Sequence, residues 1–266
     1  MKKVIAVILI VVLVMALIGC TGPKGATGAT GATGPAGPVG TPGINAGDIP
    51  PNATILLNEN FDNTTDGAVP TGWTRASVFT GSEVTITAGP ADYVSYPNCL
   101  VINTTGSSYE REIVKAPMLP IPNKTSGKLY IRFNVKCSYA MTNRDFLFYL
   151  NQTEKVRIKF ASDGLIYAYE GSYTLYTALG QYNPALWNQV LTVIDLANSK
   201  YSVYIDGTLK VSNLNCLILA ERKLDGTPIS AANAIYTDFF GMLTDVDSTY
   251  SNNATLIDDI AIYYLP

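Results

Sequence analysis

The sequence predicts an all-β protein whose main body is an antiparallel β-sandwich, preceded by an apolar leader and a glycine-rich stalk. First, short apolar runs separated by turn residues follow one another from residue 54 to residue 266. Second, several runs alternate apolar and polar residues, a period of two that is typical of half-buried antiparallel strands. Third, no long run has the helical period of 3.6, and a body of about 215 residues suits one sandwich.

Composition excludes several classes of function. The chain has 18 Lys and Arg residues against 21 Asp and Glu residues, with no basic block, so we expect no nucleic-acid partner. It contains no histidine, which removes His general bases, Ser-His-Asp triads and His-ligated zinc. Charged residues make up 15% of the chain, and its polar residues are mostly uncharged, as is common in secreted and cell-surface proteins.

The N-terminus reads as a membrane-targeting segment. Lys2 and Lys3 precede an apolar run from residue 4 to residue 19, which ends in Leu17-Ile18-Gly19-Cys20. This ending resembles the lipobox of prokaryotic lipoproteins. The resemblance implies that residues 1–19 are a signal peptide and that Cys20 carries the membrane lipid. An uncleaved signal anchor is the alternative, and both place the rest of the chain outside the cytoplasmic membrane, anchored to the cell membrane or cell surface.

Residues 20–43 contain a strict glycine repeat. Glycine stands at 22, 25, 28, 31, 34, 37, 40 and 43, the Gly-X-Y period of a collagen-like stalk. Its function would be a trimerising spacer of roughly 70 Å, which makes a homotrimer the expected oligomer. The alternative is a monomeric, flexible linker that shares only the composition of collagen. Residues 44–53 leave the repeat and are expected to be a hinge.

The head is expected to span residues 54–266. Turn pairs such as Asp163-Gly164 and Asp206-Gly207 separate its runs, and residues 128–136 alternate cleanly between apolar and polar. The expected strands are 54–57, 83–87, 99–103, 128–138, 146–151, 155–161, 165–169, 187–195, 200–205, 208–214, 235–243 and 255–264.

Three passages of the head resemble one family. Residues 187–210 run from Trp187 to the Asp206-Gly207 turn, residues 57–62 read LNENFD, and residues 256–263 read LIDDIAIY. Together they resemble the concanavalin A-like (laminin-G-like) sandwiches of lectins and glucanases. The resemblance covers most of residues 54–266, implies a jelly roll, and implies that the first and last strands pair.

Paired terminal strands would also bring carboxylates together. Many relatives in this family hold calcium through carboxylates and backbone carbonyls, and Glu59, Asp62 and Asp258 would approach one another here. We therefore expect structural calcium at these residues as one alternative. Solvated turn carboxylates without a metal are the other alternative.

Tyrosines provide the candidate carbohydrate site. Tyr167, Tyr169, Tyr173, Tyr176 and Tyr182 crowd one hairpin region beside amide side chains, and Tyr173, Tyr176 and Tyr182 are the expected binding residues. Aromatic faces flanked by amides suit sugars, because the C–H face of a pyranose is apolar and its rim carries hydroxyls. The alternative is that these rings cover a sheet and its core.

Catalysis is not expected. Glycosidases of the family carry an E-x-D-x-x-E pattern on one strand, and the sequence lacks it. The nearest pair, Glu110 and Glu112, has no third acid. We therefore expect no enzyme.

Cysteines and sequons complete the candidate sites. Apart from Cys20, the cysteines are Cys99, Cys137 and Cys216, which allow one disulfide and a thiol or three buried thiols. N-x-Thr sequons, the acceptors for N-glycosylation, begin at Asn52, Asn63, Asn103, Asn123, Asn151 and Asn253.

The sequence therefore favours a membrane-anchored lipoprotein whose head binds a carbohydrate or another surface polymer. A structural, trimerising protein of the cell envelope is the first alternative. A hydrolase acting on glycans is the second.

Overall fold

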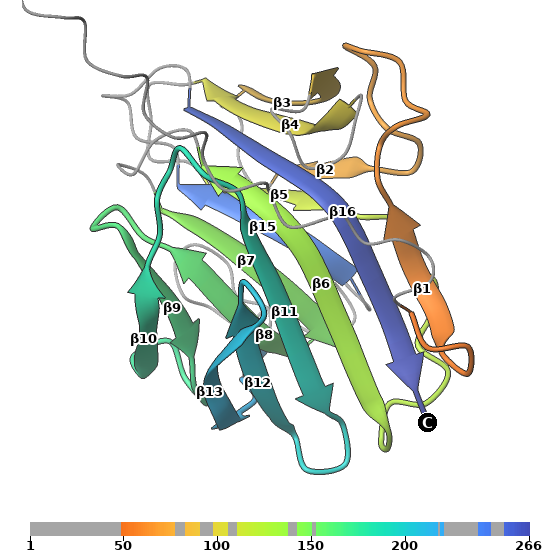
Figure 1. Cartoon of the computed structure of the whole chain (residues 1–266), viewed down its shortest axis with the longest axis vertical. Coiled ribbons are helices and arrows are strands. Elements are labelled where there is room, and N and C mark those ends of the chain that lie inside the picture. The colour runs from red at the N-terminus through yellow and green to blue at the C-terminus, as the bar shows by residue number, and fades with distance from the viewer. Residues whose placement is uncertain are drawn as a thin grey trace, which may run out of the picture. The chain divides into compact units, whose positions relative to one another are not determined.

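The computed structural model describes residues 49–77, 83–90, 98–105, 111–137, 143–150, 153–217, 219–220, 239–245 and 253–266 (Figure 1). The expected signal peptide (1–19), the stalk (20–43) and the start of the hinge lie outside the described residues. Within those residues, no helix is long and apolar enough to cross a membrane.

The described strands form two eight-stranded sheets, and every strand pair that follows is antiparallel. Sheet A has the order β13 (Thr208–Asn215), β12 (Lys200–Ile205), β11 (Asn188–Asp195), β6 (Lys128–Cys137), β16 (Asn253–Leu265), β4 (Asn98–Thr105), β3 (Glu83–Pro90), with β1 (Thr54–Glu59) also paired to β16. Sheet B has the order β10 (Tyr176–Gln181), β9 (Leu165–Tyr169), β8 (Thr153–Phe160), β7 (Arg144–Leu150), β15 (Phe239–Asp245), β5 (Arg111–Lys115), β2 (Thr74–Ser77), with β14 (Leu219–Ala220) paired to β8.

The two sheets pack face to face around one core. Figure 1 looks through sheet A, with β6, β16 and β11 in front of β7 and β15 of sheet B. Phe133 of β6 lies 4.6 Å from Phe146 of β7 and 5.2 Å from Phe240 of β15, measured between ring centroids. Because aromatic rings bury large areas, this cluster joins the sheets at their centre. The expected all-β sandwich is confirmed for the described residues.

Alternation along the strands decides which side chains enter the core. In β6, Leu129, Ile131 and Phe133 are buried, and the residues between them are partly exposed. In β8, Val156, Ile158 and Phe160 are buried in the same way. The polar residues between them therefore line the outer face of each sheet.

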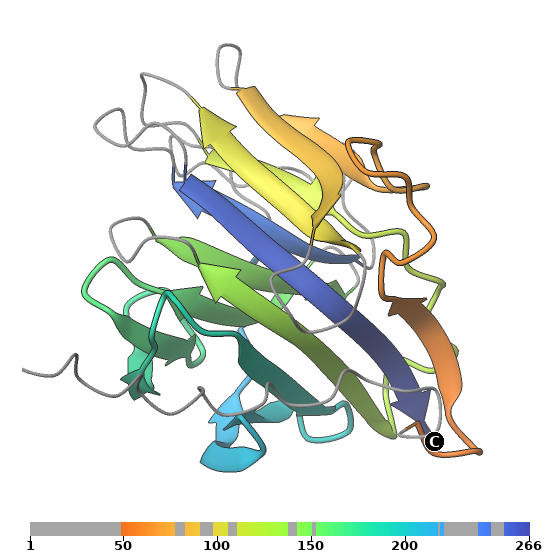
Figure 2. The same cartoon turned by 45° about the horizontal axis from the view of Figure 1, so that its top comes forward.

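The first and last strands of the head pair, as the family resemblance implied. β1 runs antiparallel to β16, from Thr54 opposite Tyr264 to Glu59 opposite Ile260. Figures 1 and 2 show the orange β1 beside the blue β16 from both directions. Residues Val39–Pro266 form one compact unit that contains every buried residue of the core cluster. We therefore expect residues 39–266 to fold without the preceding segment.

Candidate functional site

A β-bulge in β8 turns a carboxylate to the outer face of sheet B. Val156 pairs with Phe148 and Glu154 pairs with Tyr149, so Lys155 is an extra residue between two regular pairs. Such an insertion reverses the side-chain alternation on one side of the bulge. Glu154 therefore shares the outer face with Tyr149 and with Arg157, three residues further along β8.

Glu154 is fully buried although it lies on this outer face. Its Oε2 accepts hydrogen bonds from the hydroxyls of Tyr149, at 3.0 Å, and Tyr173, at 2.8 Å. Arg157 donates from Nε to Oε1 at 2.8 Å and from a terminal nitrogen to Oε2 at 3.1 Å. All of these partners are donors, so both oxygens of Glu154 act as acceptors, which is the hydrogen-bonding role of an ionised carboxylate.

Arg157 joins Glu154 to a second buried carboxylate. Its Nη1 lies 3.8 Å from Oδ2 of Asp145 on β7, the neighbouring strand. The guanidinium carbon lies 4.5 Å from the ring centroid of Tyr173 and 5.7 Å from that of Tyr169. Two carboxylates, one guanidinium and the tyrosine rings thus form one cluster, which we call the β7–β8 cluster (Asp145, Tyr149, Glu154, Arg157, Tyr173).

The protonation states in the β7–β8 cluster follow from burial and charge. Burial, and then the charge of Glu154, raises the pKa of Tyr149 and of Tyr173 above their ordinary value. Burial alone would lower the pKa of Arg157, but the charges of Glu154 and Asp145 raise it above its ordinary value. Both hydroxyls therefore stay protonated and can donate to Glu154 at neutral pH.

Tyrosine rings cover the edge of sheet B next to this cluster. Tyr167 and Tyr169 of β9 point outward, since Ile166 and Ala168, which alternate with them along the strand, are buried. Tyr176 of β10 lies opposite Tyr169, with its ring centroid 5.7 Å from that of Tyr169 and 5.1 Å from that of Tyr167. We call these three rings the tyrosine platform (Tyr167, Tyr169, Tyr176).

The platform is accessible to a ligand. Tyr176 of the platform is 57% exposed, and Tyr173 of the neighbouring β7–β8 cluster is 37% exposed. The Tyr167 hydroxyl donates to Asp163 at 2.7 Å, and this hydrogen bond raises the pKa of Tyr167 to about 12. The structure therefore brings two expected carbohydrate-binding residues, Tyr173 and Tyr176, to one surface.

Tyr182, the third expected carbohydrate-binding residue, lies in the core. It is 7% exposed, and its ring packs edge-on against Phe160 with centroids 5.1 Å apart. Its hydroxyl donates to the carbonyl of Ala161 at 2.9 Å. No ring face of Tyr182 is left for a ligand. Tyr169 belongs to the same expected tyrosine group but was not among the three expected binding residues, and it lies on the outer face of β9.

The expected calcium residues are occupied in local hydrogen bonds. Glu59 accepts from the backbone N–H of Phe61 at 2.8 Å, and Asp258 accepts from that of Asp259 at 2.8 Å. Asp62 accepts from the side chain of Asn60 at 2.7 Å. Among the described residues, no three metal-binding side chains are grouped around one point. Calcium binding at Glu59, Asp62 and Asp258 stays a prediction.

Asp259 is buried beside these residues at a second irregularity of pairing. The register of β16 against β6 shifts between Asp258 and Ala261, and Asp259 has a φ of 48°. Asn134 donates to its Oδ2 at 3.1 Å. Burial, and then the charge of Asp62, raises the pKa of Asp259 to about 6, against the lowering effects of Asn134 and Arg132.

This raised pKa predicts that ionisation of Asp259 makes the head less stable at neutral pH than it would be with a protonated side chain at this position. Because the folded pKa exceeds the unfolded value of about 3.9, the contribution of Asp259 to stability is greatest below about pH 4 and is lost as pH rises through about 6. We expect Asp259→Asn to raise the free energy of unfolding at pH 7.5 by about 1–2 kcal/mol, allowing for solvent screening. Asparagine also tolerates a positive φ.

Urea unfolding of both proteins at pH 4.5 and 7.5 measures this effect. The gain from Asp259→Asn should shrink to about a third or less at pH 4.5, where the wild-type carboxyl of the folded protein is protonated. A gain of the same size at both pH values would contradict the assignment to Asp259.

The remaining predicted residues are distributed as follows. Cys99, Cys137 and Cys216 are buried thiols, and the described residues contain no disulfide. Among the sequons, Asn52, Asn63 and Asn123 are exposed in turns or loops, while Asn103 and Asn253 lie in β4 and β16. Asn151 and Cys20 lie outside the described residues.

Comparisons with known proteins concern the fold. No family model and no curated protein matches the chain. A sialidase matches with 15% identity and a TM-score of 0.53 over 79% of this chain, which spans 18% of the sialidase. The endo-1,3-β-glucanase of Streptomyces sioyaensis matches with 13% identity and a TM-score of 0.50, over 82% of this chain and 98% of the glucanase. The head has the β-sandwich fold of these proteins.

A further structure is less similar. Domain 4 of AbnA, a GH43 extracellular arabinanase from Geobacillus stearothermophilus in complex with arabinotriose, has a TM-score of 0.47. Its identity to this chain is 17%, over 81% of this chain and 95% of that domain.

The expectation that the head is not an enzyme is contradicted. The sandwich matches an endo-1,3-β-glucanase over 98% of that enzyme. The expectation rested on the absence of histidine and of carboxylates closely spaced on one strand. In the structure, Asp145 and Glu154 come from two neighbouring strands and meet at Arg157. No spacing pattern within a single strand can detect such a pair.

Proposed function

We propose that the outer face of sheet B binds a carbohydrate. The observation that carries this proposal is the tyrosine platform, in which the exposed ring of Tyr176 and the partly exposed rings of Tyr167 and Tyr169 lie beside the charged β7–β8 cluster. Ring faces can stack on the apolar C–H face of a sugar, while its hydroxyls need donors and acceptors at the rim. The cluster supplies both at the edge of the platform, through the hydroxyl of Tyr173 and the guanidinium of Arg157.

The shared fold supports a role on glycans without identifying one. A β-sandwich can present a ligand site on the outer face of one sheet, and function depends on the side chains there. The site combines aromatic surface with a few fixed polar groups, the usual composition of a ligand-binding surface. A carbohydrate therefore fits this face better than a protein partner that would need a large apolar patch.

Tyr176 is the residue whose removal should weaken glycan binding with least effect on stability, because it is the most exposed ring of the platform. We expect Tyr176→Ala to weaken binding about ten-fold, which corresponds to roughly 1.4 kcal/mol. Tyr176→Phe should bind within about two-fold of wild type. Residues 39–266 would be screened on a glycan array, and the best ligand titrated by calorimetry.

Tyr204→Ala provides the matched control, because Tyr204 lies on β12 in the other sheet. Its binding should equal that of wild type. If no glycan binds, or if Tyr176→Ala and Tyr204→Ala behave alike, the outer face of sheet B is not the binding surface.

Glycan hydrolysis is a second candidate function, favoured by the pair of buried carboxylates. Because one guanidinium contacts both Asp145 and Glu154, the two groups lie no further apart than the roughly 9.5 Å upper limit for glycosidase pairs. One carboxyl would act as acid and the other as base or nucleophile. Release of reducing sugar from the glycan that binds would support this candidate.

We also propose the surroundings in which this head works. The lipobox ending at Cys20 supports attachment to membrane lipid, and the glycine repeat of residues 20–43 supports a spacer, with a homotrimer as its assembled form. The head would then meet its ligand outside the cytoplasmic membrane, tens of ångströms from the lipid surface.

A further inference from the structure

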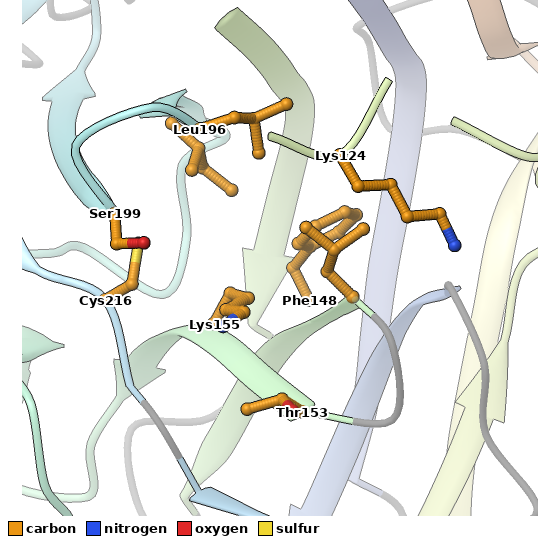
Figure 3. Close-up of a pocket in the computed structure, with 9 residues that line it drawn as sticks. Lys124, Phe148, Thr153, Lys155, Leu196, Ser199 and Cys216 are labelled. Atoms are coloured by element: carbon orange, nitrogen blue, oxygen red, sulfur yellow. The ribbon is translucent and has the colours of Figure 1, made fainter. Parts of the chain in front are cut away.

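A cavity opens between the two sheets at one end of the sandwich, away from the outer face of sheet B. Its volume is about 240 Å³, and it lies between strand ends of β7 and β8 and the turn that joins β11 to β12 (Figure 3). This is below the roughly 300–1,000 Å³ of pockets for drug-sized ligands. It exceeds the roughly 150 Å³ that is enough to hold benzene. A ligand here would therefore be a small molecule.

The floor of the cavity is apolar. Phe148 and Leu150 of β7 form one side, and Ile194 of β11 and Leu196, which directly follows β11, form the other. All four are buried, with exposures of 1–8%. Figure 3 shows Phe148 and Leu196 lining the space from opposite sides. An apolar body placed between them would gain the free energy of leaving water, about 25 cal/mol per Å².

The rim of the cavity is cationic. Lys124 and Lys155 line it together with Thr153, Ser199 and Cys216, and the described lining includes no carboxylate. Within the described part of the chain, the ammonium of Lys155 forms no ion pair or side-chain hydrogen bond. A group with a negative charge would therefore find a cation and hydroxyl donors at this rim.

The β8 bulge explains why Lys155 faces this cavity. Lys155 is the extra residue between the pairs Phe148–Val156 and Tyr149–Glu154. In such a bulge, two consecutive residues lie opposite one partner and project to the same side. Lys155 therefore points inward, to the same side as Val156. The charge of Lys155 acts on the thiol of Cys216, lowering its pKa against the larger effect of burial, which raises it to about 11.

Asp195, the carboxylate whose charge acts on this thiol, accepts hydrogen bonds from Asn198. Asp195 raises the pKa of Cys216, and its carboxylate accepts from the backbone and side chain of Asn198 at 3.0 and 2.9 Å. Asp195 is not among the lining residues. The described lining of the cavity therefore offers Lys155 no carboxylate partner.

From this cavity we infer a binding site for a small organic anion with an apolar tail, such as a medium-chain carboxylate. The tail lies between Phe148, Leu150, Ile194 and Leu196, and the carboxylate pairs with Lys155 at the rim. This site is separate from the tyrosine platform, and its existence does not depend on glycan binding.

Calorimetric titration of residues 39–266 with octanoate at pH 7.5 tests this inference. Octanoate should bind at one site, at least ten-fold more tightly than 1-octanol or acetate, which supply only the tail or only the charge. Lys155→Met should weaken octanoate binding at least ten-fold, because it keeps an unbranched side chain of similar length and removes the charge. Lys155→Arg should retain binding within about three-fold.

Two controls locate the site. Lys210→Met removes an exposed lysine of β13 that does not line the cavity, and should bind octanoate like wild type. Octanoate should also slow modification of Cys216 by a neutral methanethiosulfonate, measured by mass spectrometry. Absence of binding, equal binding by Lys155→Met, or binding that leaves Cys216 unprotected would each overturn the inference. Thermal unfolding of Lys155→Met shows that a loss of binding is not a loss of fold.

Discussion

Replacing Glu154 with glutamine is expected to lower the free energy of unfolding by about 3 kcal/mol, because it removes the acceptor charge from a buried ion pair. The fully buried carboxylate accepts from Tyr149, Tyr173 and Arg157. A glutamine would present an NH₂ group to these donors and leave the guanidinium with Asp145 alone. Urea unfolding of residues 39–266 at pH 7.5 measures the loss.

Glu170→Gln is the matched control for this prediction. Glu170 accepts from the side chain of Asn215 at 2.8 Å, but this contact is exposed to solvent. Its replacement should cost no more than about 0.5–1 kcal/mol. Equal losses for the two variants would show that the β7–β8 cluster is not a buried ionic network.

The same variant separates the two candidate functions. If the head only binds glycans and Glu154 only positions Arg157 and Tyr173, Glu154→Gln will weaken glycan binding. In a hydrolase, by contrast, the variant would lose turnover by several orders of magnitude while still binding the glycan, provided that the fold persists. Binding and reducing-sugar release measured on one protein sample therefore assign the role of the carboxylate.

Strands with strong alternation could be predicted from sequence. Residues 165–169 and 200–205 coincide with β9 and β12, and residues 128–138 end one position beyond β6. β10 was missed because its burial pattern does not alternate, with only Leu179 buried among its six residues. The short strands β2, β5 and β14 were missed for a related reason: two to five residues give too little pattern to detect a period.

The candidate sites depended on information that the sequence pattern does not carry. A tyrosine-rich region was visible, but its alternation alone could not tell that Tyr169 is outward and Tyr182 is buried. The bulge at Lys155 depends on how β8 pairs with β7, and it reverses which of Glu154 and Lys155 faces outward. One register shift therefore creates both the ionic cluster on the outer face and the cationic rim of the cavity. Strict alternation along β8 would instead place Glu154 inward and Lys155 outward.

Gly127 is the position at which a single methyl group should do most damage by packing alone. It has a φ of 78°, and a Cβ there would lie 2.4 Å from the carbonyl oxygen of Leu265 and 2.8 Å from the ring of Tyr264. Both neighbours belong to β16, the strand that also pairs with β1 and β6. We expect Gly127→Ala to lower the free energy of unfolding by about 3 kcal/mol, from backbone strain and overpacking together.

Gly164→Ala separates these two causes, because Gly164 has a φ of 83° but no atom within 4 Å of its Cβ position. It should lose only the conformational part, about 1 kcal/mol. The difference between the variants, about 2 kcal/mol, then measures how tightly the end of β16 is held against the start of β6. Equal losses would mean that the last residues of β16 move away at little cost. In that case the end of β16 would be loosely packed and its pairing with β1 would add little stability. The expected difference of about 2 kcal/mol would instead show that this end of the sandwich is rigidly packed.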